Sequence, residues 1–140
     1  MIEAWRHIRQ GDVFIARIPV ERHGSIQAGI RPVVVVSADW LNTSSSVFTA
    51  AELTTRLKNP TMPVHYVLPM IKGLPRRSMV LGEATARLIR EDLIEYRCSV
   101  PREVYKNIDR VVRCALRKKR RHKNRKNKRR PNGRFRGKKG

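Results

Sequence analysis

The stretch that decides the fold spans residues 29–57 and reads GIRPVVVVSADWLNTSSSVFTAAELTTRL. Four consecutive valines at 33–36, bounded by a proline and by a polar segment, predict a strand that is buried on both faces. A second apolar run, residues 47–53, predicts a second strand, which ends in the triplet TTR at 54–56. If the two strands pair antiparallel, Arg31 at the start of the first lies beside that triplet. A guanidinium next to hydroxyls on a rigid sheet edge is suited to binding a phosphodiester, and cleavage of that bond is a hypothesis that follows.

The length of 140 residues suits one domain with an appendage. No apolar run approaches the roughly 18 to 20 residues that span a membrane. Charged side chains interrupt the first ten residues, so they lack the pattern of a secretion signal. We therefore expect a cytoplasmic protein with no membrane partner. Within this lead-in segment, Trp5 is the expected anchor to the rest of the domain.

The positive charge is concentrated at the C-terminus. Residues 117–140 hold 15 of the 32 Lys and Arg and none of the 11 acids, which leaves residues 1–116 only mildly basic. A segment of this composition cannot bury enough apolar surface to fold alone, so we expect a folded domain over 1–116 and a disordered basic tail over 117–140. Lys118, Arg120 and Arg125 are candidate contacts to RNA phosphates. Non-specific adhesion, or no selected role, is the alternative for the tail.

Shorter patterns predict the remaining elements. Apolar, β-branched runs predict strands at 13–18, 63–69 and 78–84, with a bulge at Gly82. Prolines confine the strand at 63–69 to an edge or to a short length. Single helical turns are expected at 39–42 and 91–93, a flap-like loop at 21–29, and one clear helix from Pro101 to 116.

These elements show no alternation of strand and helix. The predicted fold class is therefore mainly β (α+β), a small, strongly bent antiparallel sheet or partial barrel with a C-terminal helix. A core of this size is marginal alone, so a homodimer is a natural expectation. The two cysteines, Cys98 and Cys114, lack metal-site spacing, and a reducing compartment favours two thiols over the alternative of a disulfide. No metal or other cofactor is expected.

Several motifs carry a family resemblance. They are GDVF at 11–14, GIRPVVVVS at 29–37, Asp39 and Asn42, LTTRL at 53–57, PVH at 63–65, GL at 73–74 and SMVLGE at 78–83. In order and spacing they resemble the PemK/MazF family, the toxin endoribonucleases of type II toxin-antitoxin systems. The resemblance covers residues 8–116 and not the tail. It implies an SH3-like barrel that forms a homodimer and is neutralised by a small partner antitoxin.

The resemblance also implies a reaction. Family members cut single-stranded RNA, usually mRNA, without a metal and leave 2′,3′-cyclic phosphate and 5′-hydroxyl ends; nucleic-acid binding, to RNA and to DNA, belongs to this expectation. Arg31 matches the family's catalytic arginine, and Thr54 matches its catalytic threonine. Arg31 fits two phosphate oxygens but is a poor base, so we expect it to stabilise charge; proton donation to the leaving 5′-oxygen is a secondary hypothesis for it. We expect Thr54 to hold a phosphoryl oxygen or to orient the 2′-hydroxyl.

Other polar residues are candidate RNA contacts. They are Gln27, Thr55, Arg56, His65, Arg76, Arg77 and Arg87. For the arginines the alternative is a solvated surface charge, for the threonine a strand-forming residue, and for the histidine a structural role. Glu83 lies in an apolar strand, and pairing with an arginine is favoured over a role in proton transfer.

The chain departs from the family pattern at three places. The loop before Arg31 reads IQAG instead of the usual EQGG, and Glu52 stands where the family has a small or apolar residue or proline. Residues 83–86 read EATA, which displaces Arg87 by one position and, on a strand, turns it to the opposite face. A carboxylate two residues before Thr54 shares its face of the strand and would repel a phosphate there. The alternative hypothesis is therefore a weakened or inactive RNA-binding module whose basic tail supplies the affinity.

Overall fold

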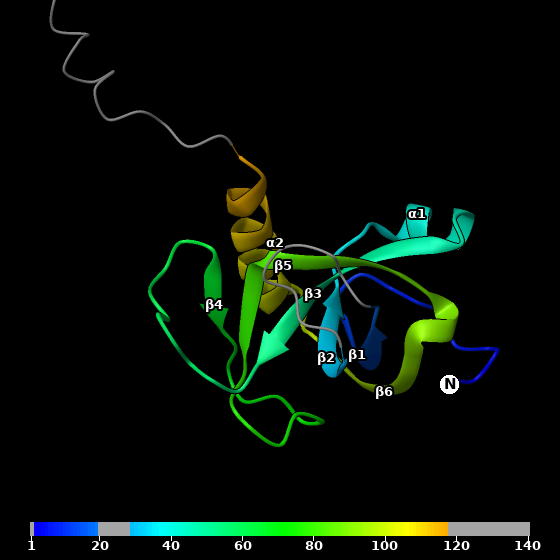
Figure 1. Cartoon of the computed structure of the whole chain (residues 1–140), viewed down its shortest axis with the longest axis horizontal. Coiled ribbons are helices and arrows are strands. Elements are labelled where there is room, and N and C mark those ends of the chain that lie inside the picture. Colours follow the sequence, from blue (N-terminus) through cyan, green and yellow to red (C-terminus); the bar gives the residue numbers. More distant parts are fainter. Residues whose placement is uncertain (1, 20–28, 118–140) are drawn as a thin grey trace, which may run out of the picture.

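The computed structural model describes residues 2–19 and 29–117, which form a six-stranded antiparallel sheet with one main helix (Figure 1). In chain order the elements are β1 (Asp12–Ile18), β2 (Gly29–Val35), α1 (Asp39–Ser44), β3 (Val47–Thr54), β4 (His65–Val67), β5 (Met79–Ile89), the 3₁₀ turn η1 (Arg90–Asp92), β6 (Leu93–Ser99) and α2 (Arg102–Leu116). The strand order is β4-β5-β3-β2-β1-β6. Among the described residues no ladder joins β4 to β6, so the bent sheet stays open there. The mainly-β, α+β class is confirmed.

The valine run forms the centre of the sheet. β2 pairs antiparallel with β1 on one side and with β3 on the other. Val33, Val34 and Val35 are each fully buried, which confirms the prediction of a strand buried on both faces. Because side chains alternate along a strand, Val33 and Val35 enter one apolar cluster and Val34 enters the other.

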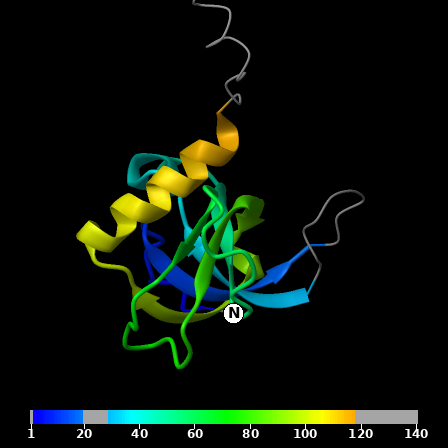
Figure 2. The same cartoon turned by 90° about the vertical axis from the view of Figure 1, so that its left-hand side faces the viewer.

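The two clusters lie on opposite faces of the sheet. On one face, Ile108, Val111 and Val112 of α2 pack against Val34, Leu53 and their neighbours. Figure 2 shows α2 lying across that side of the sheet. The other face holds Phe14, Phe48 and Leu88, among others, and no residue of α2. The apolar face predicted for the C-terminal helix is thus the one that covers the sheet, although Leu116 at its end is exposed.

A bulge in β5 sets how closely α2 approaches the sheet. The register of β3 on β5 shifts between Ala51 and Glu52, so the extra residues lie at 82–84 and the predicted bulge at Gly82 is confirmed. A Cβ atom on Gly82 would lie 2.5 Å from the carbonyl oxygen of Val111 and 2.8 Å from that of Val64. Only glycine fits, because the backbones of three segments meet there.

Several strands differ from the prediction. β5 runs to Ile89, five residues beyond the expected end, and β6 was not predicted at all. β6 pairs with β1 through two register shifts, and only two of its seven residues are buried. The strand expected at 63–69 is shortened to β4, which lies at the edge of the sheet as its flanking prolines predicted.

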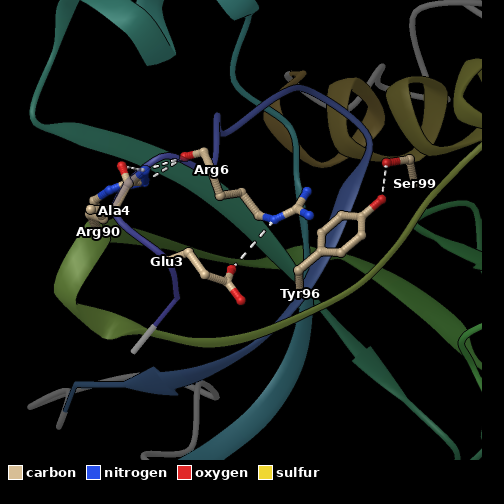
Figure 3. A network of polar contacts seen from close by, with 6 residues as sticks. All are labelled: Glu3, Ala4, Arg6, Arg90, Tyr96 and Ser99. Carbon is tan, nitrogen blue, oxygen red and sulfur yellow. Dashed lines mark hydrogen bonds and ion pairs between the residues drawn. The ribbon is translucent and has the colours of Figure 1, made fainter.

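The lead-in segment is anchored by residues other than the expected one. Trp5 is 67% exposed, so the prediction that it anchors the segment was wrong. Ile2 is buried in the apolar cluster opposite α2, and its backbone N–H donates to the carbonyl of Leu93. The Arg90 guanidinium donates to two carbonyls of the segment, and the guanidinium of Arg6 lies 3.9 Å from the ring centroid of Tyr96 (Figure 3). Backbone carbonyls, which no composition pattern reveals, therefore hold this segment.

Two predicted segments, the flap and the basic tail, fall outside the described residues, whereas the two cysteines and the helices can be checked. The flap lies almost wholly in residues 20–28, and the tail beyond residue 117 is likewise not described. Cys98 and Cys114 are free thiols, as favoured, and Cys98 is buried. Within the described part of the chain, no helix is both long enough and apolar enough to cross a membrane.

Candidate functional site

The ends of β2 and β3 meet as the sequence predicted. Val33 pairs with Glu52, and continuing this register by two residues brings Arg31 opposite Thr54. Both line a pocket of about 580 Å³ on the edge of these two strands. The lining residues are Ile30, Arg31, Pro32, Glu52, Leu53, Thr54, Thr55, Arg56 and Leu81. Four of the predicted site residues are thereby brought to one place.

Thr54 closes β3 with its side chain turned to the pocket. Its hydroxyl oxygen accepts a hydrogen bond from the backbone N–H of Arg56 at 3.1 Å, which turns the chain out of the strand. A hydroxyl that accepts a bond still has a proton to donate. The same turn brings Thr55 and Arg56 to the pocket wall. The site therefore offers one hydroxyl donor fixed by the strand and two further polar side chains on the loop that follows.

Glu52 is the buried acid of this pocket. Its side chain is 7% exposed, and its Oε1 atom lies 4.0 Å from Nε of Arg31, whose side chain is 32% exposed. Its Oε2 atom has no hydrogen-bond partner among the described residues. Burial raises the pKa of Glu52 above its ordinary value, the Arg31 guanidinium opposes this, and the Glu83 carboxylate adds to it. The alternation along β3 placed Glu52 on the face of Thr54, but the sequence indicated only repulsion and not an ion pair with Arg31.

His65 is held by the protein through both ring nitrogens. Nδ1 lies 2.9 Å from the carbonyl oxygen of Asn59, and Nε2 lies 3.0 Å from Oε2 of Glu83. Both partners are acceptors, so the ring satisfies both when it carries two protons. The expectation that Glu83 pairs with an arginine was wrong, because β4 brings a histidine to it instead. The side chain of His65 is 7% exposed and does not line the pocket, which favours the structural alternative over an RNA contact.

Of the remaining predicted contacts, the three that the structure describes lie away from the pocket. Arg87 is opposite Thr49 on β3, which is about 17 Å along the strand from Thr54 at the usual rise per residue. Arg76 and Arg77 are exposed on the loop before β5 and do not line the pocket. Gln27, Lys118, Arg120 and Arg125 lie outside the described residues.

The electrostatics of the site suit an anion. Arg31 and Arg56 both line the pocket, against the single carboxylate of Glu52. Among residues 2–19 and 29–117, no three His, Cys, Asp or Glu side chains gather closely enough to hold a metal ion. A phosphate bound here would meet a bidentate guanidinium donor and a hydroxyl donor.

Comparisons with known proteins identify the family and the fold. The sequence model of PemK-like, MazF-like toxins of type II toxin-antitoxin systems matches residues 9–116. A solved MazF from Deinococcus radiodurans is 23% identical, with a TM-score of 0.65 over 77% of this chain and 94% of that one. An endoribonuclease from a mycobacterial species, solved in complex with its cognate antitoxin, is 20% identical, with a TM-score of 0.63 over 77% of this chain and 93% of that one. At these identities the structural likeness shows a shared fold.

Proposed function

Because the chain belongs to the PemK-like, MazF-like toxins of type II toxin-antitoxin systems, a family of endoribonucleases, we propose that it cleaves single-stranded RNA without a metal. The observation that carries the proposal is the pocket that Arg31 and Thr54 both line. The expected products are a 2′,3′-cyclic phosphate and a 5′-hydroxyl, since the attacking group is the 2′-hydroxyl next to the scissile phosphate. The substrate is mRNA cut at a short sequence.

Each of the two residues has a defined task. Arg31 binds two oxygens of the phosphate through its planar fork and stabilises the negative charge that develops on them in the transition state. Thr54 donates a hydrogen bond from its hydroxyl to a phosphoryl oxygen or orients the 2′-hydroxyl, while its oxygen accepts a hydrogen bond from the backbone N–H of Arg56. The strand pairing that fixes both residues removes the need to order them during the reaction.

The proposal includes partners. A cognate antitoxin protein is expected to bind the toxin and suppress it, and the similar mycobacterial endoribonuclease was solved with such a partner. A homodimer is expected, in line with the small size of the core. Thr55 and Arg56 are proposed to contact RNA beside the cut, and the basic residues beyond 117 to add affinity through phosphates.

Incubation of the purified protein with a mixed single-stranded RNA in EDTA tests the proposal. Discrete cleavage is expected, with end groups identified by kinase and phosphatase treatment. Arg31→Ala is expected to abolish it, whereas Arg102→Ala, which removes an exposed arginine from α2, is expected to leave it unchanged.

The alternative predicts a different pattern in the same experiment. A non-catalytic RNA-binding module would bind RNA without cutting it and would lose that binding when residues 117–140 are removed. The buried Glu52 is the feature that favours this alternative, since a carboxylate beside Arg31 opposes the binding of a phosphate. If the wild-type protein cleaves RNA and the Arg31→Ala variant still does so, the proposed role of the site is also contradicted.

A further inference from the structure

The attack of a 2′-hydroxyl on phosphorus requires a group that takes its proton, and neither Arg31 nor Thr54 can do so near neutral pH. Of the nine residues that line the pocket, Glu52 is the one whose side chain can accept a proton in that range. We propose that Glu52 is the general base of the cleavage reaction. This inference rests on the proposed function, and it reverses the expectation that Glu52 only weakens the site.

The position of Glu52 suits this role. It lies two residues before Thr54 on β3, so both side chains are on the same face, which is the face away from α2. Its Oε1 atom is directed to Arg31 at 4.0 Å. Its Oε2 atom, although buried, has no hydrogen-bond partner among the described residues. A buried carboxylate oxygen without a donor is costly, so the fold holds this carboxylate at the pocket at a cost in stability.

The charges around Glu52 come from three elements. Arg31 faces it from β2 and Glu83 from β5, and Arg56 lines the same pocket from the loop after β3. From β4, His65 reaches Glu83 and bonds to it. Burial and Glu83 make the carboxylate more basic than an exposed one, while Arg31 favours its ionised form. A carboxylate made more basic by its surroundings is a better proton acceptor, which is what a general base requires.

The proposed step balances as follows. The carboxylate of Glu52, which lines the pocket, takes the proton of the 2′-hydroxyl while the 2′-oxygen forms a bond to phosphorus and the bond from phosphorus to the 5′-oxygen breaks. The leaving 5′-oxygen takes a proton from a water molecule. The protonated Glu52 then gives its proton to the hydroxide that remains, which restores the carboxylate. Arg31 holds the phosphoryl oxygens throughout and keeps its own proton.

The test compares Glu52→Gln with the wild-type protein in single-turnover cleavage of labelled RNA in EDTA, between about pH 5 and about pH 9. For the wild type, the rate is expected to rise tenfold per pH unit on the acid side and then to level off. Glu52→Gln is expected to lower the plateau by about 10²- to 10⁴-fold and to remove the acid limb. Glu95→Gln, the same change at an exposed site on β6, is the matched control and should superimpose on the wild type.

Two further measurements distinguish loss of the general base in Glu52→Gln from disruption of its folded structure. Binding of an RNA with 2′-deoxy sugars, which cannot be cleaved, should be unchanged or tighter in Glu52→Gln, because a negative charge near the phosphate is removed. Glu52→Asp, which keeps a carboxylate on a shorter arm, should retain the acid limb at a reduced rate. Loss of binding together with loss of cleavage in both variants would assign Glu52 a structural role and overturn the proposal.

The remaining outcomes distinguish failure of the proposed general base from failure of the proposed function. If the wild type cleaves RNA and Glu52→Gln cleaves it equally fast or faster, the carboxylate is not the base, and the proposed function still holds. If the wild type and Glu52→Gln both fail to cleave any RNA, the proposed function fails and the base with it.

Discussion

Two buried carboxylates of similar exposure lie in very different surroundings. Asp12, at the start of β1, and Glu52, in β3, are each 5% exposed, and burial raises the pKa of both. Asp12 accepts hydrogen bonds from the backbone of Arg9 at 3.0 Å and from the hydroxyl of Ser99 at 2.7 Å. Glu52 has the Arg31 guanidinium at 4.0 Å, and its Oε2 atom has no hydrogen-bond partner in the described part of the chain.

This difference indicates a structural role for Asp12 and a role in the reaction for Glu52. Hydrogen bonds offset part of the desolvation of Asp12, and they join the lead-in segment, β1 and the end of β6 at one point. The Ser99 hydroxyl continues this network to the phenol oxygen of Tyr96 (Figure 3). Glu52 lacks such bonds, so its burial reduces stability and is explained by its place in the pocket. Stability should depend on the Asp12 region and cleavage on the Glu52 region.

The largest effect is expected at Asp12. Asp12→Ala leaves the Arg9 N–H and the Ser99 hydroxyl without their acceptor in a partly buried corner, so the free energy of unfolding should fall by about 3 kcal/mol. Urea titration followed by circular dichroism measures it. Asp12→Asn, which keeps an acceptor oxygen, should lose less. Equal losses for the two variants would mean that the charge, and not the hydrogen bonds, holds this corner.

The second prediction concerns two substitutions with opposite effects, one on cleavage and one on stability. If either changed both properties, the distinction between the Asp12 and Glu52 regions would be wrong. Thr54→Val removes the hydroxyl at constant shape and should slow cleavage by about 10- to 100-fold with little change in unfolding free energy. Ser99→Ala should do the opposite and cost about 1 kcal/mol of stability without slowing cleavage. The test measures the cleavage rate of a labelled RNA and the urea midpoint for four proteins: wild type, Thr54→Val, Thr54→Ser and Ser99→Ala. Slower cleavage by Ser99→Ala than by the wild type would show that the Asp12 and Glu52 regions are coupled.

A third, smaller effect concerns the acid that has a partner, Glu83. Burial opposes the charge on His65, but hydrogen bonds to Glu83 and to the Asn59 carbonyl outweigh it, so the pKa of His65 is raised in the folded state. Its contribution to stability is therefore complete below the unfolded pKa of about 6.5 and is lost as the pH rises through the folded value. We expect a loss of about 1 kcal/mol, measured by urea unfolding at a series of pH values. In Glu83→Gln this pH dependence should shrink; an unchanged slope would exclude the pair as its source.

The smallest effect is expected where a buried charge is removed. Glu52→Gln should change the free energy of unfolding by less than about 1 kcal/mol, and a gain in stability is the expected direction, because the amide is easier to bury than a carboxylate with few hydrogen bonds. The same urea titration measures it. A loss as large as that of Asp12→Ala would show that the Arg31 pair is structural.

The parts of the fold that were predictable rest on local patterns. Four valines between a proline and a polar loop located β2, and antiparallel pairing then required Arg31 and Thr54 to meet. β6 was missed although its sequence carries a strand signal, since Ile94, Tyr96 and Cys98 alternate with polar residues. Its irregular register on β1 could not be predicted from that alternation.

Contacts between distant segments account for what was missed in the site. The bond between His65 and Glu83 joins residues 18 positions apart, and it depends on β4 folding back onto β5. The ion pair of Arg31 with Glu52 likewise depends on the exact diagonal between β2 and β3. Alternation along β3 predicted which face Glu52 occupies, but burial and the direction of the carboxylate come from the packing of three strands.

The two thiols of this protein make it ready for fluorescence work without mutation. Cys98 is buried, and burial raises the pKa of its thiol, so it should react slowly with a maleimide dye. Cys114 is partly exposed on α2, the helix that covers the face of the sheet away from Glu52 and Thr54. A dye placed there leaves the pocket unobstructed, and energy transfer to a labelled RNA end would then report, one molecule at a time, on when the strand arrives and when its two pieces leave.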